Sequence, residues 1–331
     1  MIKLIGLRLF AALATLAVLS AVIFSATEIL PGDVADLQLG QYATKESTEQ
    51  LRKELGITGT PIERYGRWLN GIAHGDFGKS MTTRGPVADL LEERLKNTAT
   101  LAGFTALIAV PIAVLLGISM ALYAGTLFER ITSAVVMAFA AVPEFLVATV
   151  AVAVFAVSLK WLPAVSYVTP GLSLKALAVA LVLPILTLVL HITAQIARMT
   201  KSTIANILTQ PFIEMADLKG LSAWRKIAFH VGPNMAGPLA NVIALNVAYL
   251  VSGVVVVETV FAYPGLARLM IDAVNGRDMP VIQACAMIFS AVYILLIFIA
   301  DLSAASANPR LRKTVEPKVV ANLVRQRGNL R

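Results

Sequence analysis

The chain has 331 residues, of which 57% are hydrophobic and 15% are charged, whereas a soluble domain carries about 25% charged residues. It therefore lacks the polar surface that a water-soluble globule of this size needs. The formal net charge of +8 would also suit a nucleic-acid-binding protein. The Lys and Arg residues of this chain, however, are distributed as the topology of a membrane protein predicts. We therefore expect membrane lipid, and no nucleic acid, as a partner.

Six runs of sequence are long and apolar enough to cross a hydrocarbon core, which takes about 20 helical residues. In chain order they occupy Leu9 to Thr27, the interval between Lys96 and Glu129, the interval between Arg130 and Lys160, Ala176 to Ala197, the interval between His230 and Glu258, and the interval between Asp278 and Asp301. The third run is broken only by Glu144, and Pro143 beside it predicts a kink. The first run exceeds the roughly 7 to 15 residues of a cleaved signal peptide, so we expect it to remain as a span.

Backbone groups in lipid must be satisfied within their own segment, and the alternating ten-residue segments of a membrane barrel are missing from the sequence. The sequence therefore predicts an all-α integral membrane protein with six transmembrane helices.

The distribution of Lys and Arg in the short loops predicts the orientation of these helices. With a cytoplasmic N-terminus, the cytoplasmic segments hold Lys3, Arg8, Arg130, Arg198, Lys201, Lys219, Arg225, Lys226, Arg310, Arg312, Lys313, Lys318, Arg325, Arg327 and Arg331. The two short outside loops hold only Lys160, Lys175, Arg268 and Arg277. We therefore expect both termini to be cytoplasmic in a multi-pass protein of the cell inner membrane.

The chain divides into four parts on this topology. They are a first transmembrane helix at 1–30, a periplasmic segment at 31–97, a membrane domain at 98–303 with a cytoplasmic loop at 199–234, and a basic cytoplasmic tail at 304–331. In the periplasmic segment Thr44 can cap a helix that ends at Gly56, and Pro86 can begin a second helix that leads into the second span. This segment is either a solvated connector or a docking surface.

Catalytic and metal-binding patterns are missing from the sequence. There is no phosphate-binding GxxxxGK[ST] loop and no HExxH motif, and His74, His191 and His230 fall in three different segments. The single Cys285 allows neither a disulfide framework nor a cysteine metal cluster. We therefore expect a non-catalytic chain that binds no cofactor and no metal.

Positions 214–235 read EMADLKGLSAWRKIAFHVGPNM, a polar and positively charged stretch between two apolar runs. Glu214, Ala216, Gly220 and Pro233 have the spacing of the EAA loop, E-A-A-x3-G-x9-I-x-L-P, of permease subunits of ATP-binding-cassette (ABC) importers. The match is partial, because Met215 replaces the second small residue of the motif, and His230 and Gly232 stand where Ile and Leu are typical.

From end to end the chain resembles the first (B-type) permease subunit of the dipeptide/oligopeptide/nickel family of ABC importers. The motifs that carry the resemblance are Leu30-Pro31-Gly32-Asp33, Gly75-Asp76-Phe77-Gly78-Lys79-Ser80, Arg84-Gly85-Pro86-Val87, Glu93-Arg94-Leu95, Ala197-Arg198-Met199-Thr200, Lys219-Gly220-Leu221-Ser222, Glu258-Thr259-Val260-Phe261-Ala262-Tyr263-Pro264-Gly265-Leu266, Arg277-Asp278-Met279-Pro280 and Asn308-Pro309-Arg310-Leu311-Arg312. In this family the end of the loop usually departs from the EAA pattern much as it does here.

The resemblance implies the type I ABC importer permease fold and a machine of five parts. The other parts are a second homologous permease that completes a heterodimer, two ABC ATPase subunits or a homodimer of one, and an extracytoplasmic solute-binding protein. ATP and Mg would be used by the ATPases alone. The loop would dock in a groove of the ATPase, with a charged rim, small residues for close approach, and an apolar anchor. These residues are Glu214, Asp217, Lys219 and Arg225 for the rim, Ala216 and Gly220 for the approach, and Leu218, Leu221 and Trp224 for the anchor.

Ionisable and polar residues within the spans are candidates for the transport pathway, because charge in a bilayer usually faces the bundle interior or water. Glu144, His191 and Gln195 are these candidates. The alternative for Glu144 is a buried residue that is paired, for example with a backbone amide, or is protonated at neutral pH, and the alternative for His191 is an interhelical hydrogen bond. Glu258, Phe261, Pro264 and Gly265 form a candidate external gate or contact with the binding protein, and substrate binding is the alternative for Glu258.

Two other classes of protein remain as alternatives. A secondary transporter or channel would conduct by itself, and often shows paired inverted halves, of which we find no convincing repeat here; a membrane scaffold would only hold partners. The cargo is not specified by this chain. Peptides are the commonest cargo of the resembled family, which also carries glutathione, nickel chelates, opines and sugars.

Overall fold

The computed structural model describes residues 2–29, 44, 46–47, 59–169 and 171–307. These residues form helices and connecting turns, with no β-strand among them. The long helices are α1 (Ile2–Ile29), α5 (Val87–Leu122), α8 (Leu174–Leu208), α11 (Gly232–Val260) and α13 (Met279–Ala307). Each of the five is long and apolar enough to cross a membrane, which confirms the predicted all-helical membrane fold. The predicted helix from Thr44 to Gly56 falls almost entirely outside the described residues.

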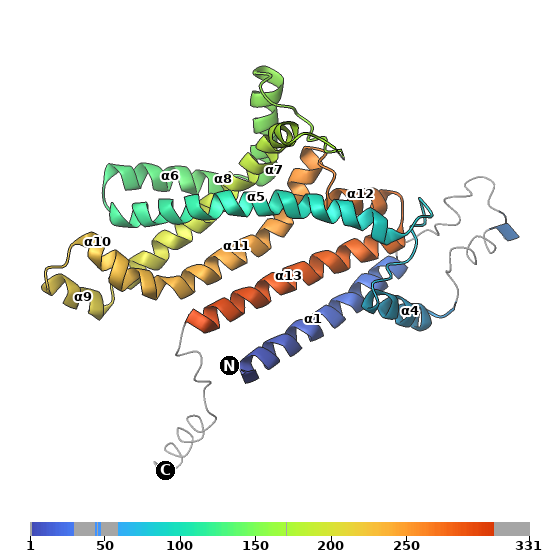
Figure 1. The fold of residues 1–331 in the computed structure, drawn as a ribbon, viewed down its shortest axis with the longest axis horizontal. Helices are drawn as coiled ribbons and strands as arrows, with labels where there is room; N and C mark the ends of the chain where they lie inside the picture. Colours follow the sequence, from blue (N-terminus) through green and yellow to red (C-terminus); the bar gives the residue numbers. More distant parts are fainter. Residues whose placement is uncertain (1, 30–43, 45, 48–58, 170, 308–331) are drawn as a thin grey trace, which may run out of the picture.

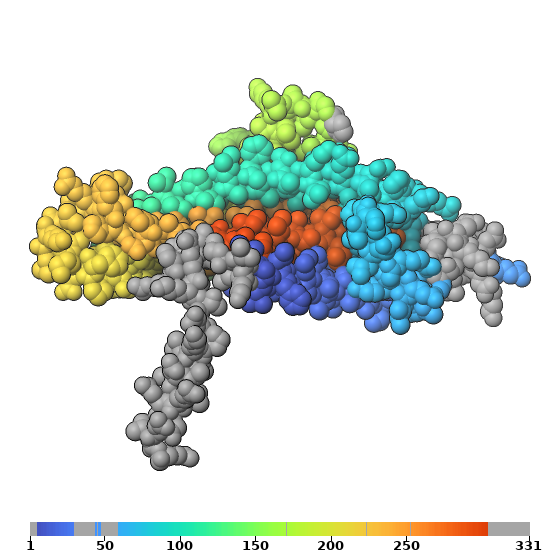
Figure 2. Space-filling model, turned by 60° about the horizontal axis from the view of Figure 1, so that its bottom comes forward, coloured from blue at the N-terminus to red at the C-terminus, as the bar shows by residue number. Residues whose placement is uncertain are grey.

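The long helices form an elongated bundle (Figure 1). α1 packs along α13, α13 packs along α11, and α8 contacts both α5 and α11. Figure 2 shows α13 between α1 and α5 on one face of the molecule. The main core joins α5, α8 and α11 through buried apolar side chains that include Leu101, Leu188, Ile196, Leu250 and Val254.

A glycine sets the distance between α5 and α8. A Cβ atom at Gly117 would lie 2.6 Å from Cβ of Thr200 and 2.7 Å from the carbonyl oxygen of Ala197. Real Cβ atoms do not approach other atoms so closely, so only glycine lets the two backbones touch here. This close approach is typical of helix pairs in membranes, where small residues occupy the contact.

The third apolar run is bent more sharply than the sequence analysis predicted. It forms α6 (Leu127–Ala141), α7 (Glu144–Ala151) and a π-helical extension, η2 (Val152–Ser158). The helices on either side of the break make an angle of 100°. Val142 is extended because the following Pro143 disfavours helical backbone at the residue before it. The run is therefore a broken pair of helices, which counts as a sixth span only if the pair is taken together.

A helix that the sequence analysis missed, α4 (Pro61–Ala73), packs against the end of α1. Its N-terminus is a capping box, in which the Thr60 and Glu63 side chains each bind the other's backbone N–H. The ring of Phe24 in α1 lies 5.4 Å from that of Tyr65 and 5.7 Å from that of Trp68. The T-P-x-E pattern at the start of α4 was the sequence signal that could have revealed it.

The chain between α4 and α5 is held against the start of α13. The Asp278 carboxylate accepts hydrogen bonds from the Ser80 hydroxyl and from the backbone N–H groups of Met81 (3.1 Å) and Thr82 (3.2 Å). The predicted helix α5 then begins at Val87, so Pro86 is its N-cap residue and not part of its first turn. Two family motifs that are far apart in sequence are thus in contact.

Candidate functional site

A cavity of about 510 Å³ lies between the start of α7, the middle of α8 and the middle of α11. It is lined by Glu144, Leu188, His191, Ile192, Gln195, Met199, Leu245, Asn246, Tyr249, Leu250 and Gly253. All three residues that the sequence analysis proposed for the pathway, Glu144, His191 and Gln195, therefore line one cavity. Their spacing along the chain did not show that they meet; the break at Pro143 and the crossing of α7 over α8 and α11 bring them together.

Glu144 is the first residue of α7, and its carboxylate lies against Gly253 of α11. A Cβ atom at Gly253 would be 2.8 Å and 2.9 Å from the two carboxylate oxygens, so the glycine makes room for the acid. Within the described residues, the Glu144 side chain has neither a hydrogen-bond partner nor an ion-pair partner. The start of a helix favours a negative charge through the helix dipole.

The other polar groups of the cavity come from α8 and α11. The Gln195 side-chain oxygen accepts a hydrogen bond from Arg198 at 3.0 Å, and the Asn246 side chain donates to the Val242 carbonyl at 2.8 Å. Nδ1 of His191 is buried and has no partner among the described residues. An unsatisfied buried nitrogen costs about 1–3 kcal/mol, so this site retains polar groups that do not stabilise the fold.

Three polar or small residues of the cavity, Asn246, Tyr249 and Gly253, were missed by the sequence analysis. They follow one another at intervals of three and four residues, which places them on one face of α11. That spacing was the sequence signal that could have found them.

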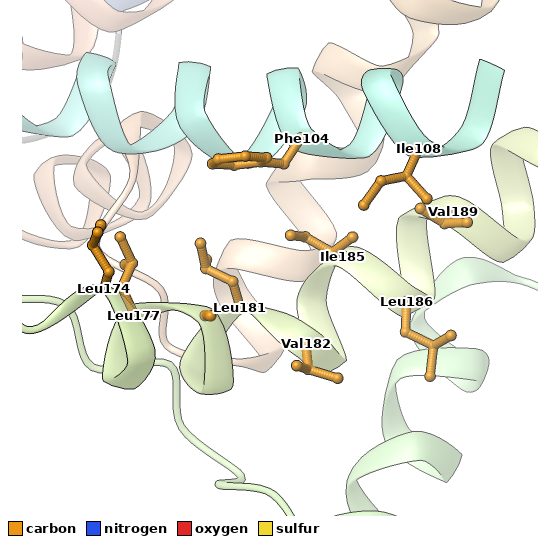
Figure 3. Close-up of a pocket in the computed structure, with 10 residues that line it drawn as sticks. Phe104, Ile108, Leu174, Leu177, Leu181, Val182, Ile185, Leu186 and Val189 are labelled. Carbon is orange, nitrogen blue, oxygen red and sulfur yellow. The ribbon is translucent and has the colours of Figure 1, made fainter. Parts of the chain in front are cut away.

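A second pocket, of about 420 Å³, lies between α5 and α8 and is entirely apolar. Figure 3 shows Phe104 and Ile108 of α5 facing a row of side chains from α8. Its lining residues are Phe104, Ile108, Leu174, Leu177, Ala178, Leu181, Val182, Ile185, Leu186 and Val189. None of these side chains has a hydrogen-bonding group, so the groove offers a polar solute no side-chain partner.

The EAA-like loop connects α8 to α11 at one end of the bundle (Figures 1 and 2). It consists of α9 (Pro211–Leu218), α10 (Ala223–Lys226) and a π-helical turn, η3 (Ile227–Val231), after which Pro233 stands in the first turn of α11. Gly220 has a φ of +71°, and the N–H groups of Gly220 and Leu221 bind the carbonyls of Asp217 (2.9 Å) and Ala216 (3.2 Å). This is the Schellman arrangement that ends a helix, and it favours glycine at the left-handed position.

The loop exposes large apolar side chains. Leu218 is 78% exposed and Trp224 is 67% exposed, and the charged Glu214, Lys219 and Arg225 are also exposed. Asp217 forms an ion pair with Lys226, which ties α9 to α10. Leu221 is half-buried.

Ala216 differs from the role expected for it. It is buried on the inner face of α9, as is Ile213, which packs on Ile204 and Val231. Its small side chain therefore serves packing within this chain, and it is not exposed for close approach to a partner.

Glu258 is fully buried at the other end of α11, outside the cavity. Its carboxylate accepts hydrogen bonds from the Thr98 hydroxyl (2.5 Å) and from the N–H groups of Ala267 (2.8 Å) and Arg268 (3.1 Å). These two N–H groups open α12 (Leu266–Asn275), so Glu258 caps that helix from a distance. A Cβ at Gly265 would overlap the carboxylate, which explains the glycine.

The remaining gate candidates form the turn between α11 and α12. The Phe261 side chain is fully buried, and its carbonyl accepts the Ser166 N–H at 2.8 Å. The Pro264 carbonyl accepts a hydrogen bond from the Asn97 side chain at 2.9 Å. Burial and the nearby Glu258 raise the pKa of Tyr263, whose hydroxyl donates to the Asn97 carbonyl at 2.8 Å. A direct contact of Glu258 or Phe261 with a binding protein is not supported, because neither side chain has exposed surface.

The chain is similar over most of its length to several known proteins. It is 31% identical over 305 residues to a probable peptide ABC transporter permease protein of Sinorhizobium fredii, over 92% of this chain and 97% of that protein. It is 31% identical over 312 residues to a putative peptide transport system permease protein of Brucella abortus, over 94% and 99%. It is 31% identical over 311 residues to the glutathione transport system permease protein GsiC of Escherichia coli, over 92% and 97%.

Two family descriptions also match the chain. Residues 1–102 match the N-terminal part of binding-protein-dependent transport system membrane components. Residues 113–313 match the binding-protein-dependent transport system inner membrane component. These matches confirm the family resemblance that the sequence motifs indicated. The chain belongs to the family of binding-protein-dependent transport system inner membrane components, and is a multi-pass permease of the inner membrane.

Proposed function

We propose that this chain is one permease subunit of an ATP-driven importer of short peptides. It forms half of the translocation pathway and works with a second homologous permease, two ABC ATPase subunits, identical or different, and an extracytoplasmic solute-binding protein. Relatives that are named for the transport of peptides and of glutathione, itself a short peptide, support this class of cargo. Both termini and the α9–α10 loop are cytoplasmic in this proposal.

The observation that carries the proposal is the position of the exposed loop. α9 follows directly on α8, and α10 leads through η3 into α11, so the loop joins the two helices that supply most of the lining of the polar cavity. A movement of the loop is therefore transmitted to the cavity along α8 and α11, which run without a break from the loop to the cavity. Movement of helices as rigid bodies is a common way to open a site alternately to two sides.

The surface of the loop suits a protein partner. Leu218, Trp224 and Phe229 are exposed apolar side chains beside a rim of charged residues, and interfaces concentrate binding energy in such apolar anchors. We propose that they dock on an ATPase subunit. The sequence contains no phosphate-binding GxxxxGK[ST] loop, so in this proposal the partner ATPase subunits bind ATP and Mg.

The proposal is tested by replacing Trp224 with alanine in the purified complex in proteoliposomes. Loss of a buried interface tryptophan costs about 2 kcal/mol, which is about a 30-fold weaker association, so the ATPases should dissociate and uptake should fall. Trp161 is 69% exposed, close to the 67% of Trp224, and lies between η2 and α8, before the end of α8 that is opposite the loop; Trp161→Ala should have no such effect. Normal ATPase association and uptake with Trp224→Ala would refute the docking surface.

A further inference from the structure

We infer that the polar cavity is a binding site for the protonated amino group of the transported solute, with Glu144 as its counter-charge. This inference rests on the proposed function and adds to it a chemical selectivity within the membrane. The ligand class is a small compound that carries an ammonium group next to an amide, as the N-terminus of a peptide does.

Glu144 is the charge that requires a partner. It lies in the broken pair of helices formed by α6 and by α7 with η2, which is long and apolar enough to cross a membrane when taken together, and carboxylates within a membrane are rare and mark pathways or partners. The part of the chain that the structure describes supplies it with no cation and no hydrogen-bond donor. A cationic solute would complete the site.

Gly253 positions this carboxylate. Any side chain at position 253 would begin within 3 Å of both oxygens, because a Cβ there would be 2.8 Å and 2.9 Å from them. The glycine therefore leaves the acid in place at the wall of the cavity. Tyr249 is one turn before Gly253 on the same face of α11, and lines the cavity with 62% of its surface exposed.

The rest of the lining matches a short peptide. The amides of Gln195 and Asn246 and the hydroxyl of Tyr249 can bind peptide N–H and carbonyl groups, and apolar side chains such as Leu188 and Leu250 can contact its aliphatic parts. A volume of about 510 Å³ lies within the range of small-molecule sites, about 300–1,000 Å³. The groove between α5 and α8 has no comparable polar group.

The charge of the cavity can be measured with thiol reagents. A cysteine at Tyr249, in a Cys285→Ala background of the assembled complex, would react with a cationic and with a neutral methanethiosulfonate of similar size. We expect the ratio of the cationic to the neutral rate to fall about tenfold when Glu144→Gln is added, which corresponds to about 1.4 kcal/mol. Glu92→Gln, which removes an exposed carboxylate that does not line the cavity, should leave the ratio unchanged. An equal ratio with and without Glu144→Gln would overturn the inference.

The ligand class has its own test in the same complex. Alanyl-alanine should slow the labelling of the cysteine at position 249, and N-acetyl-alanyl-alanine should protect at least about fivefold less, because it lacks the ammonium group. Equal protection by both peptides, or by neither, would overturn the assignment. This comparison needs only the native Glu144, so it also decides the question if Glu144→Gln does not fold.

Failure of this inference can be told from failure of the proposed function. If the wild-type complex takes up alanyl-alanine only with ATP and the binding protein, and Glu144→Gln does so at the same rate, the importer stands and the amine site is wrong. If the wild-type complex shows no ATP-dependent uptake, the proposed function itself is wrong, whatever the reagent rates.

Discussion

Replacing Gly220 with valine should uncouple ATP hydrolysis from uptake while leaving the protein inserted in the membrane. Gly220 has a φ of +71°, where a non-glycine residue costs about 1–2 kcal/mol and a β-branched residue is poorly accommodated. No atom lies within 4 Å of a Cβ built at this position, so the penalty within this chain is one of backbone conformation and not of a clash.

Relief of this strain would change the course of the loop. If φ at position 220 becomes negative, the hydrogen bonds to the carbonyls of Asp217 and Ala216, now 2.9 Å and 3.2 Å long, are lost at about 1 kcal/mol each. A difference of 1–2 kcal/mol shifts a conformational equilibrium about 5- to 30-fold. We therefore expect α10 to leave the orientation in which Trp224 and Leu218 form one surface.

The assay is uptake and substrate-stimulated ATPase activity of the complex in proteoliposomes. Gly220→Val should keep basal ATP hydrolysis and lose at least about nine-tenths of uptake. Gly220→Asn is the matched control, because asparagine tolerates the left-handed conformation, and should retain most uptake. Normal stimulated activity and uptake with Gly220→Val would refute the reasoning. Equal loss with Gly220→Asn would show that contact with the partner, and not backbone conformation, explains the glycine.

Three further predictions concern topology and packing. Cysteines at Ser47 and Arg325, in a Cys285→Ala background, should react with an impermeant reagent from outside and only after permeabilisation, respectively; the reverse pattern would overturn the orientation. Glu258→Ala should leave the first N–H groups of α12 unpaired and lower the stability of the detergent-solubilised complex by about 3 kcal/mol, seen as a clear fall in its unfolding temperature; an unchanged temperature would contradict its capping role. Gly117→Val should separate α5 from α8 at a cost of about 1–3 kcal/mol and reduce the yield of monodisperse protein, and a normal yield would show that the helices can move apart freely.

The helices could be predicted because apolar runs of this length have one stable form in lipid. Their ends could not be placed from apolarity, since α8 continues as far as Leu208 through Arg198 and Lys201. The angle at Pro143 could not be predicted either, because the sequence indicates a kink there but not how large the kink is. That angle depends on how α7 packs against α8 and α11.

The residues of the polar cavity could likewise be predicted only in part from the sequence. Glu144 and His191 could be named because charge and polarity are unusual in a span, but their meeting depends on the broken helix. The spacing of Gly253 from Asn246 and Tyr249 could have placed it on the same face of α11, but its role is evident only from the carboxylate beside it. For Glu258 the sequence indicated an external gate or a contact with the binding protein, whereas burial and the three hydrogen bonds to its carboxylate, which cap α12, could not be predicted.

The most direct test of the account is the energy source of uptake. The chain should be reconstituted with the second permease, the ATPases and the binding protein of the proposed complex, and uptake of radiolabelled alanyl-alanine measured with and without ATP. The account predicts uptake only when ATP, both permeases and the binding protein are present together. Uptake by this chain alone, driven by a solute or ion gradient without ATP, would contradict it and establish a secondary transporter.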